Sequence, residues 1–271
     1  MIAPYPKPHY NRGMFHAQDL MNAVRGLRLG HPAYLYQKTG STNDEAKRLA
    51  ESGAGEGLLV VAEEQTAGRG RLARRWLTPP GTALALSLIL RPSLQATQAA
   101  RLTMLAGLAV CEAIEQLTGL RAGLKWPNDI LLSGRKLGGI LVEGALRGEA
   151  LDYAVVGLGL NISWSPPPED VDYAATHLLA ETGEPIDRLK LLRSVLANLE
   201  GRYPNLADAS LLADWQARLL LMGEPIVIRA AEGDLRGQAQ SVDEDGALMV
   251  RLDTGELRRV VAGDVRLRRA E

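Results

Sequence analysis

The chain has 271 residues, of which 46% are hydrophobic and 23% are charged, a balance typical of a folded globular protein with room for a large and a small domain. Its net charge of −1 excludes the overall basic field of many nucleic-acid-binding proteins, and its single cysteine, Cys111, excludes an internal disulfide. No apolar run approaches the ~20 residues of a membrane span, and the N-terminus lacks the apolar core of a signal peptide, so we expect a cytoplasmic protein.

The first three quarters of the chain alternate between predicted strands and helices. Residues 1–30 are expected to form a leader with a short helix near residues 17–24. A helix capped by Ser41 or Thr42 should end near Gly53, and a second over residues 97–117 should be capped by Gly119. Apolar runs predict strands at 31–37, 57–62, 83–90, 123–132, 136–146 and 154–163. Helical patterns return at 174–199 and 210–221.

The last 50 residues have a different character. From residue 223 to 269 there is no helical pattern, and short strands are expected at 225–230, 247–252 and 256–261. Turns are expected at Glu232-Gly233, Asp245-Gly246 and Thr254-Gly255. We therefore predict an α+β protein: a leader (1–30), a mixed-sheet domain with helices packed on it (31–221) and a small β-barrel domain (222–271).

A long stretch of the chain contains no acidic residue. Between Gln65 and Cys111 there are 47 residues without an Asp or Glu and with six arginines, four of them in GRGRLARRW at residues 68–76. Glycines let the backbone turn tightly and expose its N–H groups, and arginine forks match carboxylate and phosphate oxygens. The stretch therefore favours an anion-binding loop, with a solvated basic loop as the alternative.

The same loop also fits the G-x-G-x-x-[G/A] pattern of dinucleotide-binding folds. That pattern needs a helix directly afterwards and an acidic residue about 20 positions later. The sequence WLTPP that begins at Trp76 prevents the helix, and the acid is absent. We therefore reject a Rossmann interpretation.

A second group of polar residues lies in KWPNDILLSGRKLGGILVEG, at residues 125–144. Asp129 is the only acid between Glu115 and Glu143, and Lys125 and Lys136 flank it. Asp129 with Asn128 offers oxygens of the kind Mg²⁺ binds, and the two lysines offer charge to a carboxylate and a phosphate. Gly138 and Gly139 would let a ligand approach the backbone. The alternative is a surface hairpin with a turn at Ser133-Gly134.

A third element is the apolar run VVGLGLNIS at residues 155–163. Gly157 and Gly159 interrupt it, and Asn161 follows them. Glycine inside a strand often marks close approach to a ligand, and an Asn side chain both donates and accepts hydrogen bonds.

In order along the chain, GSTN (40–43), EEQTAGRGRLARRW (63–76), KWPNDI (125–130), GRKLGGILVE (134–143) and VVGLGLNI (155–162) resemble the motifs of the biotin–protein ligases, also called biotin–[acetyl-CoA-carboxylase] ligases. The resemblance covers roughly residues 30–270 and implies a biotinyl/lipoyl-ligase-like catalytic domain followed by an SH3-like one. Leu72-Ala73 stands where a further Arg and Gly are often found. Family members that repress transcription carry a DNA-binding domain of about 60 or more residues before the catalytic domain. Here the resemblance begins near residue 30, so we expect the non-repressor type.

The resemblance also implies roles for individual residues. Ser41, Thr42, Asn43 and Gln65 would hold the biotin ring. Gly68, Arg69, Arg71, Lys136, Gly138 and Gly139 would complete the biotin site. Trp76, Lys125, Asn128, Asp129 and Asn161 would face the nucleotide, with Asp129 at a metal ion. Lys136 and Arg69 would be the catalytic pair that neutralises the carboxylate and the α-phosphate.

The implied reaction joins biotin to ATP, gives biotinyl-5′-AMP, and transfers the biotinyl group to a lysine of a biotin carboxyl carrier domain. The implied cofactors are ATP and Mg²⁺, with no DNA or membrane partner and with a homodimer as a possible assembly. The alternatives are a lipoate–protein ligase, a regulator that holds biotinyl-AMP without catalysis, and a nucleic-acid binder that uses the C-terminal arginines Arg258, Arg259, Arg266, Arg268 and Arg269. Asp253, Glu256 and Asp264 interleave with these arginines and favour a solvated strand face.

Overall fold

The computed structural model describes residues 14–171, 173–230 and 233–267. Its centre is a seven-stranded sheet in the order β1-β2-β3-β7-β6-β5-β4. The strands are β1 (Ala33–Tyr36), β2 (Leu59–Ala62), β3 (Ala83–Leu90), β4 (Gly123–Lys125), β5 (Asp129–Leu132), β6 (Arg135–Arg147) and β7 (Ala150–Asn161). The pair β1–β2 is parallel, and all other neighbours are antiparallel. The sheet is therefore mixed, as the sequence predicted.

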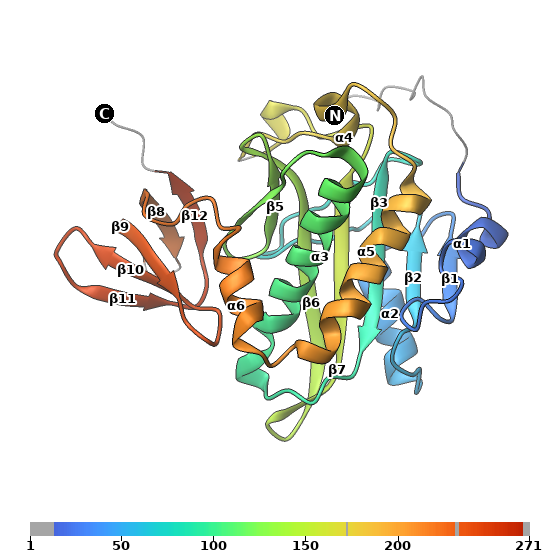
Figure 1. Ribbon diagram of the computed structural model, residues 1–271, viewed down its shortest axis with the longest axis horizontal. Coiled ribbons are helices and arrows are strands. Elements are labelled where there is room, and N and C mark those ends of the chain that lie inside the picture. The colour runs from blue at the N-terminus through green and yellow to red at the C-terminus, as the bar shows by residue number, and fades with distance from the viewer. Residues whose placement is uncertain (1–13, 172, 231–232, 268–271) are drawn as a thin grey trace.

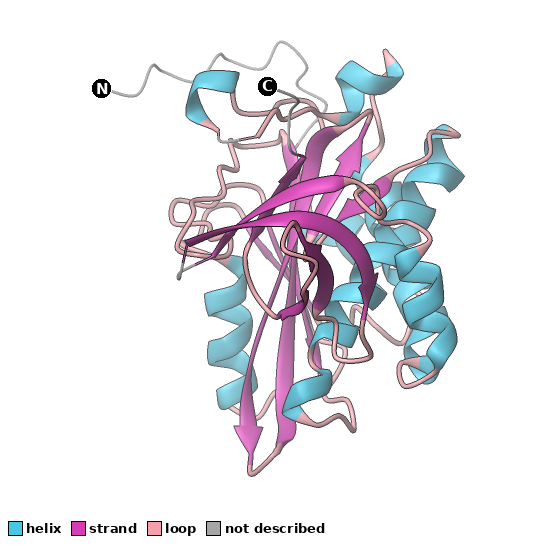
Figure 2. Cartoon of the chain, turned by 90° about the vertical axis from the view of Figure 1, so that its left-hand side faces the viewer, coloured by secondary structure: helices cyan, strands magenta, loops and turns pink. Residues whose placement is uncertain are grey.

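Helices cover both faces of this sheet (Figures 1 and 2). They are α1 (Ala17–Ala23), α2 (Thr42–Glu51), α3 (Ala100–Thr118), α4 (Leu178–Thr182), α5 (Arg188–Arg202) and α6 (Ala209–Gln216). Short 3₁₀ turns lie at Ala96–Gln98, Pro168–Asp170 and Tyr203–Asn205. The main core forms under α3 and α5, and a smaller one forms under α2. Among the described residues, no helix is both long and apolar enough to cross a bilayer.

The helix from residue 100 shows how local sequence sets these elements. Its apolar positions pack on the sheet, and it stops at Gly119, which adopts φ +70° as the predicted cap. The region 174–199, predicted as one helix, is instead a short extended segment, then α4, then α5. The break falls at Gly183, φ +73°, followed by Pro185, and a new cap at Asp187 starts α5. The predicted strand 123–132 is likewise split into β4 and β5 by the turn around Pro127.

The described residues before β1, from residue 14 on, pack on the large domain. Phe15, Leu20, Val24 and Leu29 are buried in the main core. The fully buried carboxylate of Glu63 accepts from the backbone N–H of Phe15 at 2.9 Å and from the Arg188 guanidinium at 3.0 Å. This buried ion pair joins the start of α5 to the strand end that leads into the candidate site.

The C-terminal part forms a separate five-stranded antiparallel sheet in the order β11-β10-β9-β8-β12 (Figure 1). Its strands are β8 (Pro225–Ala230), β9 (Gly233–Val242), β10 (Leu248–Leu252), β11 (Leu257–Val260) and β12 (Asp264–Leu267). Gly233, Gly246 and Gly255 have positive φ at the three predicted turns. Glu232, the other residue of the first turn, lies outside the described residues. The sequence did not predict β9 or β12, and Arg268 and Arg269 also lie outside the described residues.

Candidate active site

A cavity of about 890 Å³ opens beside the large sheet. Residues 69–72 and 74–77, the β4–β5 turn, β6, β7 and the segments 164–167 and 169–171 line it, and Gly263 and Asp264 from the C-terminal part complete the wall. All but two of the predicted site residues lie on this lining; they are Ser41, Thr42, Asn43, Gln65, Arg69, Arg71, Trp76, Lys125, Asn128, Asp129, Lys136, Gly139 and Asn161. The two exceptions are Gly68 and Gly138. The fold thus gathers residues that are up to 120 positions apart in the sequence (41 to 161).

Residues 68–76, which we call the glycine-arginine loop, form a small hairpin. The backbone of Trp76 donates to Gly68 O at 2.9 Å, and that of Gly70 donates to Arg74 O at 2.7 Å. A side chain at Gly68 would collide with the backbone of Trp76, so this glycine permits the hairpin and does not line the cavity. Leu72 and Ala73 form the tip with φ of +55° and +58°, the sign that a type I′ turn requires and that glycine adopts most easily.

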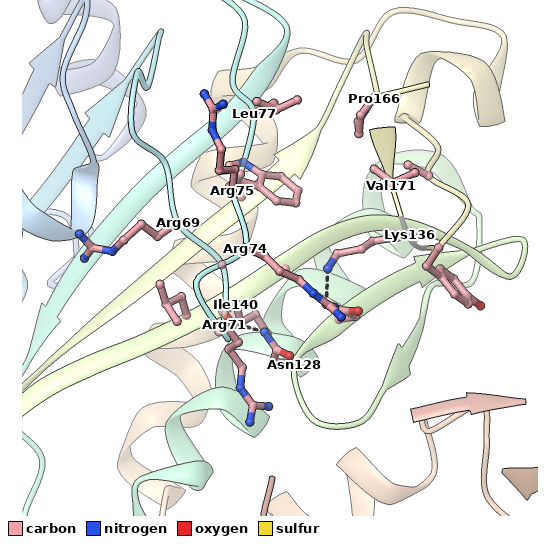
Figure 3. Close-up of a pocket in the computed structure, with 18 of the residues that line it drawn as sticks. Arg69, Arg71, Arg74, Arg75, Leu77, Asn128, Lys136, Ile140, Pro166 and Val171 are labelled. Atoms are coloured by element: carbon pink, nitrogen blue, oxygen red, sulfur yellow. Dashed lines mark hydrogen bonds and ion pairs between the residues drawn. The ribbon is translucent and has the colours of Figure 1, made fainter. Parts of the chain in front are cut away.

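The arginines of the glycine-arginine loop point in different directions (Figure 3). Arg69 extends away from Lys136 and pairs with Asp44 at 2.6 Å and with Glu143 at 2.9 Å. These contacts, led by the hydrogen bond to Asp44, raise the pKa of Arg69. The structure ties Arg69 to two carboxylates, and its predicted catalytic contact stays a prediction.

Arg71 and Arg75 have no side-chain hydrogen-bond or ion-pair partner within the described ranges, and Arg71 is the less exposed of the two. Burial lowers the pKa of the Arg71 guanidinium, and the charges of Asp129 and Asp264 partly offset that effect. Arg74 is held by Asp264 at 3.0 Å. Arg71 and Arg75 are thus the cations of this loop that are left for a ligand, and Arg71 is the one that lies in the field of Asp129 and Asp264.

A hydrogen-bonded group of polar side chains lies at the cavity, and we call it the ring pocket (residues 41–43, 65, 78 and 87). Residues 41–43 and 65 line the cavity, and Thr78 and Ser87 are buried and hydrogen-bonded to them. Oε1 of Gln65 accepts from the Thr42 backbone N–H at 2.9 Å, and Nε2 of Gln65 donates to Thr78 at 3.1 Å. The Ser87 hydroxyl is fully buried and lies 2.8 Å from the Thr42 hydroxyl. The pocket offers donors and acceptors in fixed positions, as recognition of a small polar ring requires.

A cluster of four charged side chains lies on the cavity lining, and Arg74 of the glycine-arginine loop contacts it. Lys136 contacts Asp129 at 2.5 Å, and Lys125 lies 4.0 Å from the other oxygen of the same carboxylate. Lys125 is 3% exposed and also contacts Asp264 at 3.3 Å. The ring of Tyr173 lies 4.4 Å from the Lys125 ammonium and covers it. Figure 3 shows the Lys136 contact as a dashed line.

Asp264 brings the small sheet into this cluster. Its carboxyl group is half-buried, and burial alone would raise its pKa. The opposing effects of Lys125 and Arg74 are larger in sum and bring the pKa of Asp264 below its usual value. The carboxylate therefore stays charged and links the two domains.

Two of the residues predicted to face the nucleotide make hydrogen bonds within the protein. Asn161 donates from its side chain to Thr176 O at 3.0 Å, and Asn128 donates to Ile140 O at 2.6 Å. The Trp76 indole packs on Gly159, and its buried Nε1 is without a hydrogen-bond partner among the described residues. Such a donor beside a cavity is suited to an acceptor atom of a ligand.

The strand glycines make room for neighbouring groups of the protein. A Cβ at Gly157 would collide with the Asn43 amide, and one at Gly159 with the Trp76 ring. A Cβ at Gly138 would meet Leu160, so this glycine faces the neighbouring strand β7 and not the cavity. A Cβ at Gly139 would have no atom closer than 3.8 Å. Of the pair Gly138 and Gly139, only Gly139 is therefore consistent with the predicted close approach of a ligand.

Sequence reasoning missed several residues of the site: Thr78, Ser87, Glu143, Trp164, Tyr173 and Asp264. One of them carried a signal, because Ser87 is the only polar residue in the apolar run 83–90 and a buried hydroxyl needs partners. The 164–171 segment, with Pro166 and Val171 on the cavity wall, carried no comparable signal (Figure 3).

No cluster of three or more His, Cys, Asp or Glu side chains occurs in the part of the chain that the structure describes. A dedicated metal cage is therefore absent from those residues. A single carboxylate such as Asp129 still suits Mg²⁺, which takes most of its ligands from phosphates and water.

Two family models match the chain. Residues 35–161 match the biotin/lipoate A/B protein ligase family, and residues 221–268 match the biotin protein ligase C-terminal domain. The matches coincide with the large sheet and the small sheet.

Curated relatives and solved structures agree with these models. The chain is 37% identical to a biotin–[acetyl-CoA-carboxylase] ligase of Paracoccus denitrificans, over 80% of this chain and 93% of the relative. It is 34% identical to the bifunctional ligase/repressor BirA of Bacillus subtilis, over 88% and 75%. The biotin protein ligase of Aquifex aeolicus in complex with biotin and ATP superposes with a TM-score of 0.73 at 30% identity, over 89% of this chain and 100% of that one.

Proposed function

The chain belongs to the biotin/lipoate A/B protein ligase family, and we propose that it activates biotin with ATP and transfers it to a lysine of a biotin carboxyl carrier domain. The observation that carries this proposal is one cavity with two unlike ends. One end is the neutral ring pocket around Gln65, and the other is the charged cluster around Asp129. A substrate with a polar ring and a carboxylate, used together with a nucleotide, fits both ends.

In the first step a biotin carboxylate oxygen attacks the α-phosphorus of ATP. A P–O bond forms, the bond to the β-phosphate breaks, and pyrophosphate leaves, giving biotinyl-5′-AMP. The attack brings two anions together, so positive charge must be fixed nearby beforehand. We assign that charge to Lys136 and to Arg71, the partly buried and unpaired guanidinium of the glycine-arginine loop that lies in the field of Asp129.

In the second step the amine of the acceptor lysine attacks the carbonyl of the mixed anhydride. A C–N bond forms, the C–O bond to phosphate breaks, and the amine proton and AMP are released. None of this needs an enzyme nucleophile, and the buried thiol of Cys111, whose pKa burial raises to about 12, lies outside the cavity lining.

The remaining assignments follow from where the side chains lie. The ring pocket residues Ser41, Thr42, Asn43 and Gln65 would hold the ureido ring, and Trp76 the adenine side. Asp129 would hold Mg²⁺, which would screen phosphate charge when bound. Lys125 is enclosed by Asp264, Asp129 and Tyr173, and we assign it to shaping the cluster. A homodimer and the 222–271 domain boundary stay predictions.

The direct test is to mix the protein with ATP, Mg²⁺ and labelled biotin and to measure pyrophosphate release. A carboxyl carrier domain is then added, and the label should appear on its acceptor lysine. A parallel reaction with lipoate is the control. Pyrophosphate release with lipoate but not with biotin would contradict the proposal.

A further inference from the structure

Glu143 lies on β6 beside the cavity, without lining it, and touches two separate parts of the site. Its carboxylate accepts from the Asn43 side chain at 2.8 Å and from the Arg69 guanidinium at 2.9 Å. Asn43 belongs to the ring pocket, and Arg69 belongs to the glycine-arginine loop. One carboxylate, 26% exposed, therefore joins the pocket to the loop.

The carboxylate also fixes which way the Asn43 amide points. A carboxylate and a backbone carbonyl only accept hydrogen bonds, so Nδ2 of Asn43 faces Glu143 and Leu141 O. Oδ1 then faces Ser87, whose hydroxyl oxygen is 2.6 Å away. The amide has no alternative orientation that satisfies these partners.

The orientation of the Asn43 amide determines which hydrogen bonds the Ser87 and Thr42 hydroxyls donate and accept. Each hydroxyl has one proton, and Oδ1 of Asn43 only accepts, so Ser87 donates to Asn43. The 2.8 Å contact between the two hydroxyls then requires Thr42 to donate to Ser87. The single Thr42 proton cannot also be donated to Gln65 Oε1, which lies 3.2 Å away and accepts the Thr42 backbone N–H at 2.9 Å. The Thr42 hydroxyl is left as an acceptor toward the cavity.

We propose that Glu143 is a positioning residue that makes Thr42 an acceptor for a ring N–H and, through Arg69, holds the glycine-arginine loop in place. A cyclic urea has such N–H groups, so the proposal rests on the proposed function. Ring recognition and loop placement are then coupled, because the same carboxylate supports both.

The charge state of Glu143 agrees with this role. Burial raises its pKa, but the hydrogen bonds from Asn43 and Arg69 outweigh burial and leave the pKa below its usual value. The group is ionised, and acceptor-only, at neutral pH. Since it does not reach the reacting atoms, its loss should affect biotin binding more than the rate at saturation.

The test is the isosteric variant Glu143→Gln, with Ser87→Ala and Arg69→Gln as variants that each remove one half of the connection. Biotin affinity is measured by calorimetry, and kcat by pyrophosphate release. Loop placement is measured as the rate of trypsin cleavage after Arg71, Arg74 and Arg75 in the ligand-free protein. Glu149→Gln, an exposed acid at the β6–β7 hairpin, is the matched control.

We expect Glu143→Gln to weaken biotin binding by about tenfold to a hundredfold, the effect of one or two misplaced buried hydrogen bonds. It should speed loop cleavage severalfold and change kcat by less than the affinity. Ser87→Ala should weaken binding with normal cleavage, and Arg69→Gln should speed cleavage. The proposal would be overturned if Glu143→Gln bound biotin and was cleaved by trypsin like the wild type. If Glu143→Gln does not fold, wild-type affinity in Ser87→Ala together with a wild-type cleavage rate in Arg69→Gln would overturn it.

The two proposals fail in different ways. If the wild-type protein binds no biotin and releases no pyrophosphate, the proposed function is wrong. The cleavage measurement needs no ligand, so it still decides whether Glu143 holds the loop.

Discussion

Oδ1 and Oδ2 of Asp129 face two different ammonium groups, Lys136 at 2.5 Å and Lys125 at 4.0 Å. The single negative charge of Asp129 cannot neutralise both lysines. Lys125 also contacts a second carboxylate, Asp264, at 3.3 Å. Arg71 adds a further positive charge to the same cavity. Lys136, which is 27% exposed, is the ammonium of the pair that an incoming anion can reach.

Replacing Lys136 with alanine should remove charge at the point where two anions meet. We expect pyrophosphate release to fall by about 10²–10³-fold or to be abolished, with the melting temperature little changed because the side chain is partly exposed. Lys190→Ala, an exposed lysine on α5, is the control. A Lys136→Ala protein with near-normal adenylate formation would remove this residue from the chemistry.

Asp264→Asn should loosen the link between the small sheet and the large domain. It leaves the ammonium of Lys125, 3% exposed, with Asp129 at 4.0 Å as its remaining ion-pair contact, and we expect a loss of about 3 kcal/mol in the free energy of unfolding. Denaturant unfolding at pH 7 measures this loss in the free energy of unfolding. Asp253→Asn, in the turn between β10 and β11, is a comparison in the same sheet.

The ion pair between Asp264 and Lys125 also predicts how the free energy of unfolding depends on pH. The folded-state pKa of Asp264 is depressed, so its stabilisation is complete above the unfolded pKa of about 3.9 and is lost as pH falls through the folded value. The stability difference between wild type and Asp264→Asn should therefore be constant from pH 7 to about 5 and shrink below about 4. A difference that instead grew on acidification would contradict this assignment.

The sequence located residues of the cavity lining better than it predicted their partners. Lys136 stands out because glycines and isolated charges surround it, whereas Gln65 was singled out only by the resemblance of its motif to those of the biotin–protein ligases. The partner of Lys125 lies 139 positions away, at Asp264, on a strand whose pattern is too short to be recognised. Contacts of that separation depend on how two sheets meet, which no local pattern encodes.

The same limit explains the errors in the fold. Apolar periodicity found β3 with its bounds and α3 within three residues, because long buried elements repeat their pattern. It joined α4 to α5 because Gly183 and Pro185 are short interruptions in an otherwise helical composition. It missed β9, whose alternation between exposed and buried residues contains few large apolar side chains.

Ala73→Gly should stabilise the protein. Ala73 has φ +58° at the tip of the glycine-arginine loop, where glycine adopts the conformation without the Cβ clash. We expect a gain of about 0.5–1 kcal/mol after the larger chain entropy of glycine is deducted. Ala67→Gly, just before the loop and outside the positive-φ residues, should instead lose stability. If both variants changed stability alike, the tip would not be strained.

The two strand glycines of β7 offer a way to separate the two ends of the cavity. A methyl group at Gly157 would push the Asn43 amide, and with it the hydrogen bonds that lead to Thr42. A methyl group at Gly159 would push the Trp76 indole. Because each collision involves a different neighbour, Gly157→Ala should weaken biotin binding more than nucleotide binding, and Gly159→Ala should do the reverse.

Each variant is titrated separately with biotin and with a non-hydrolysable ATP analogue. We expect losses of about tenfold in the affected affinity, together with about 1–3 kcal/mol of stability from overpacking. Gly201→Ala on α5, where a Cβ meets nothing within 4 Å, controls for the substitution itself and should stabilise its helix. Equal losses of both affinities in both variants would mean that the strand moves as a whole, and that the ring pocket and the indole are not independent sites.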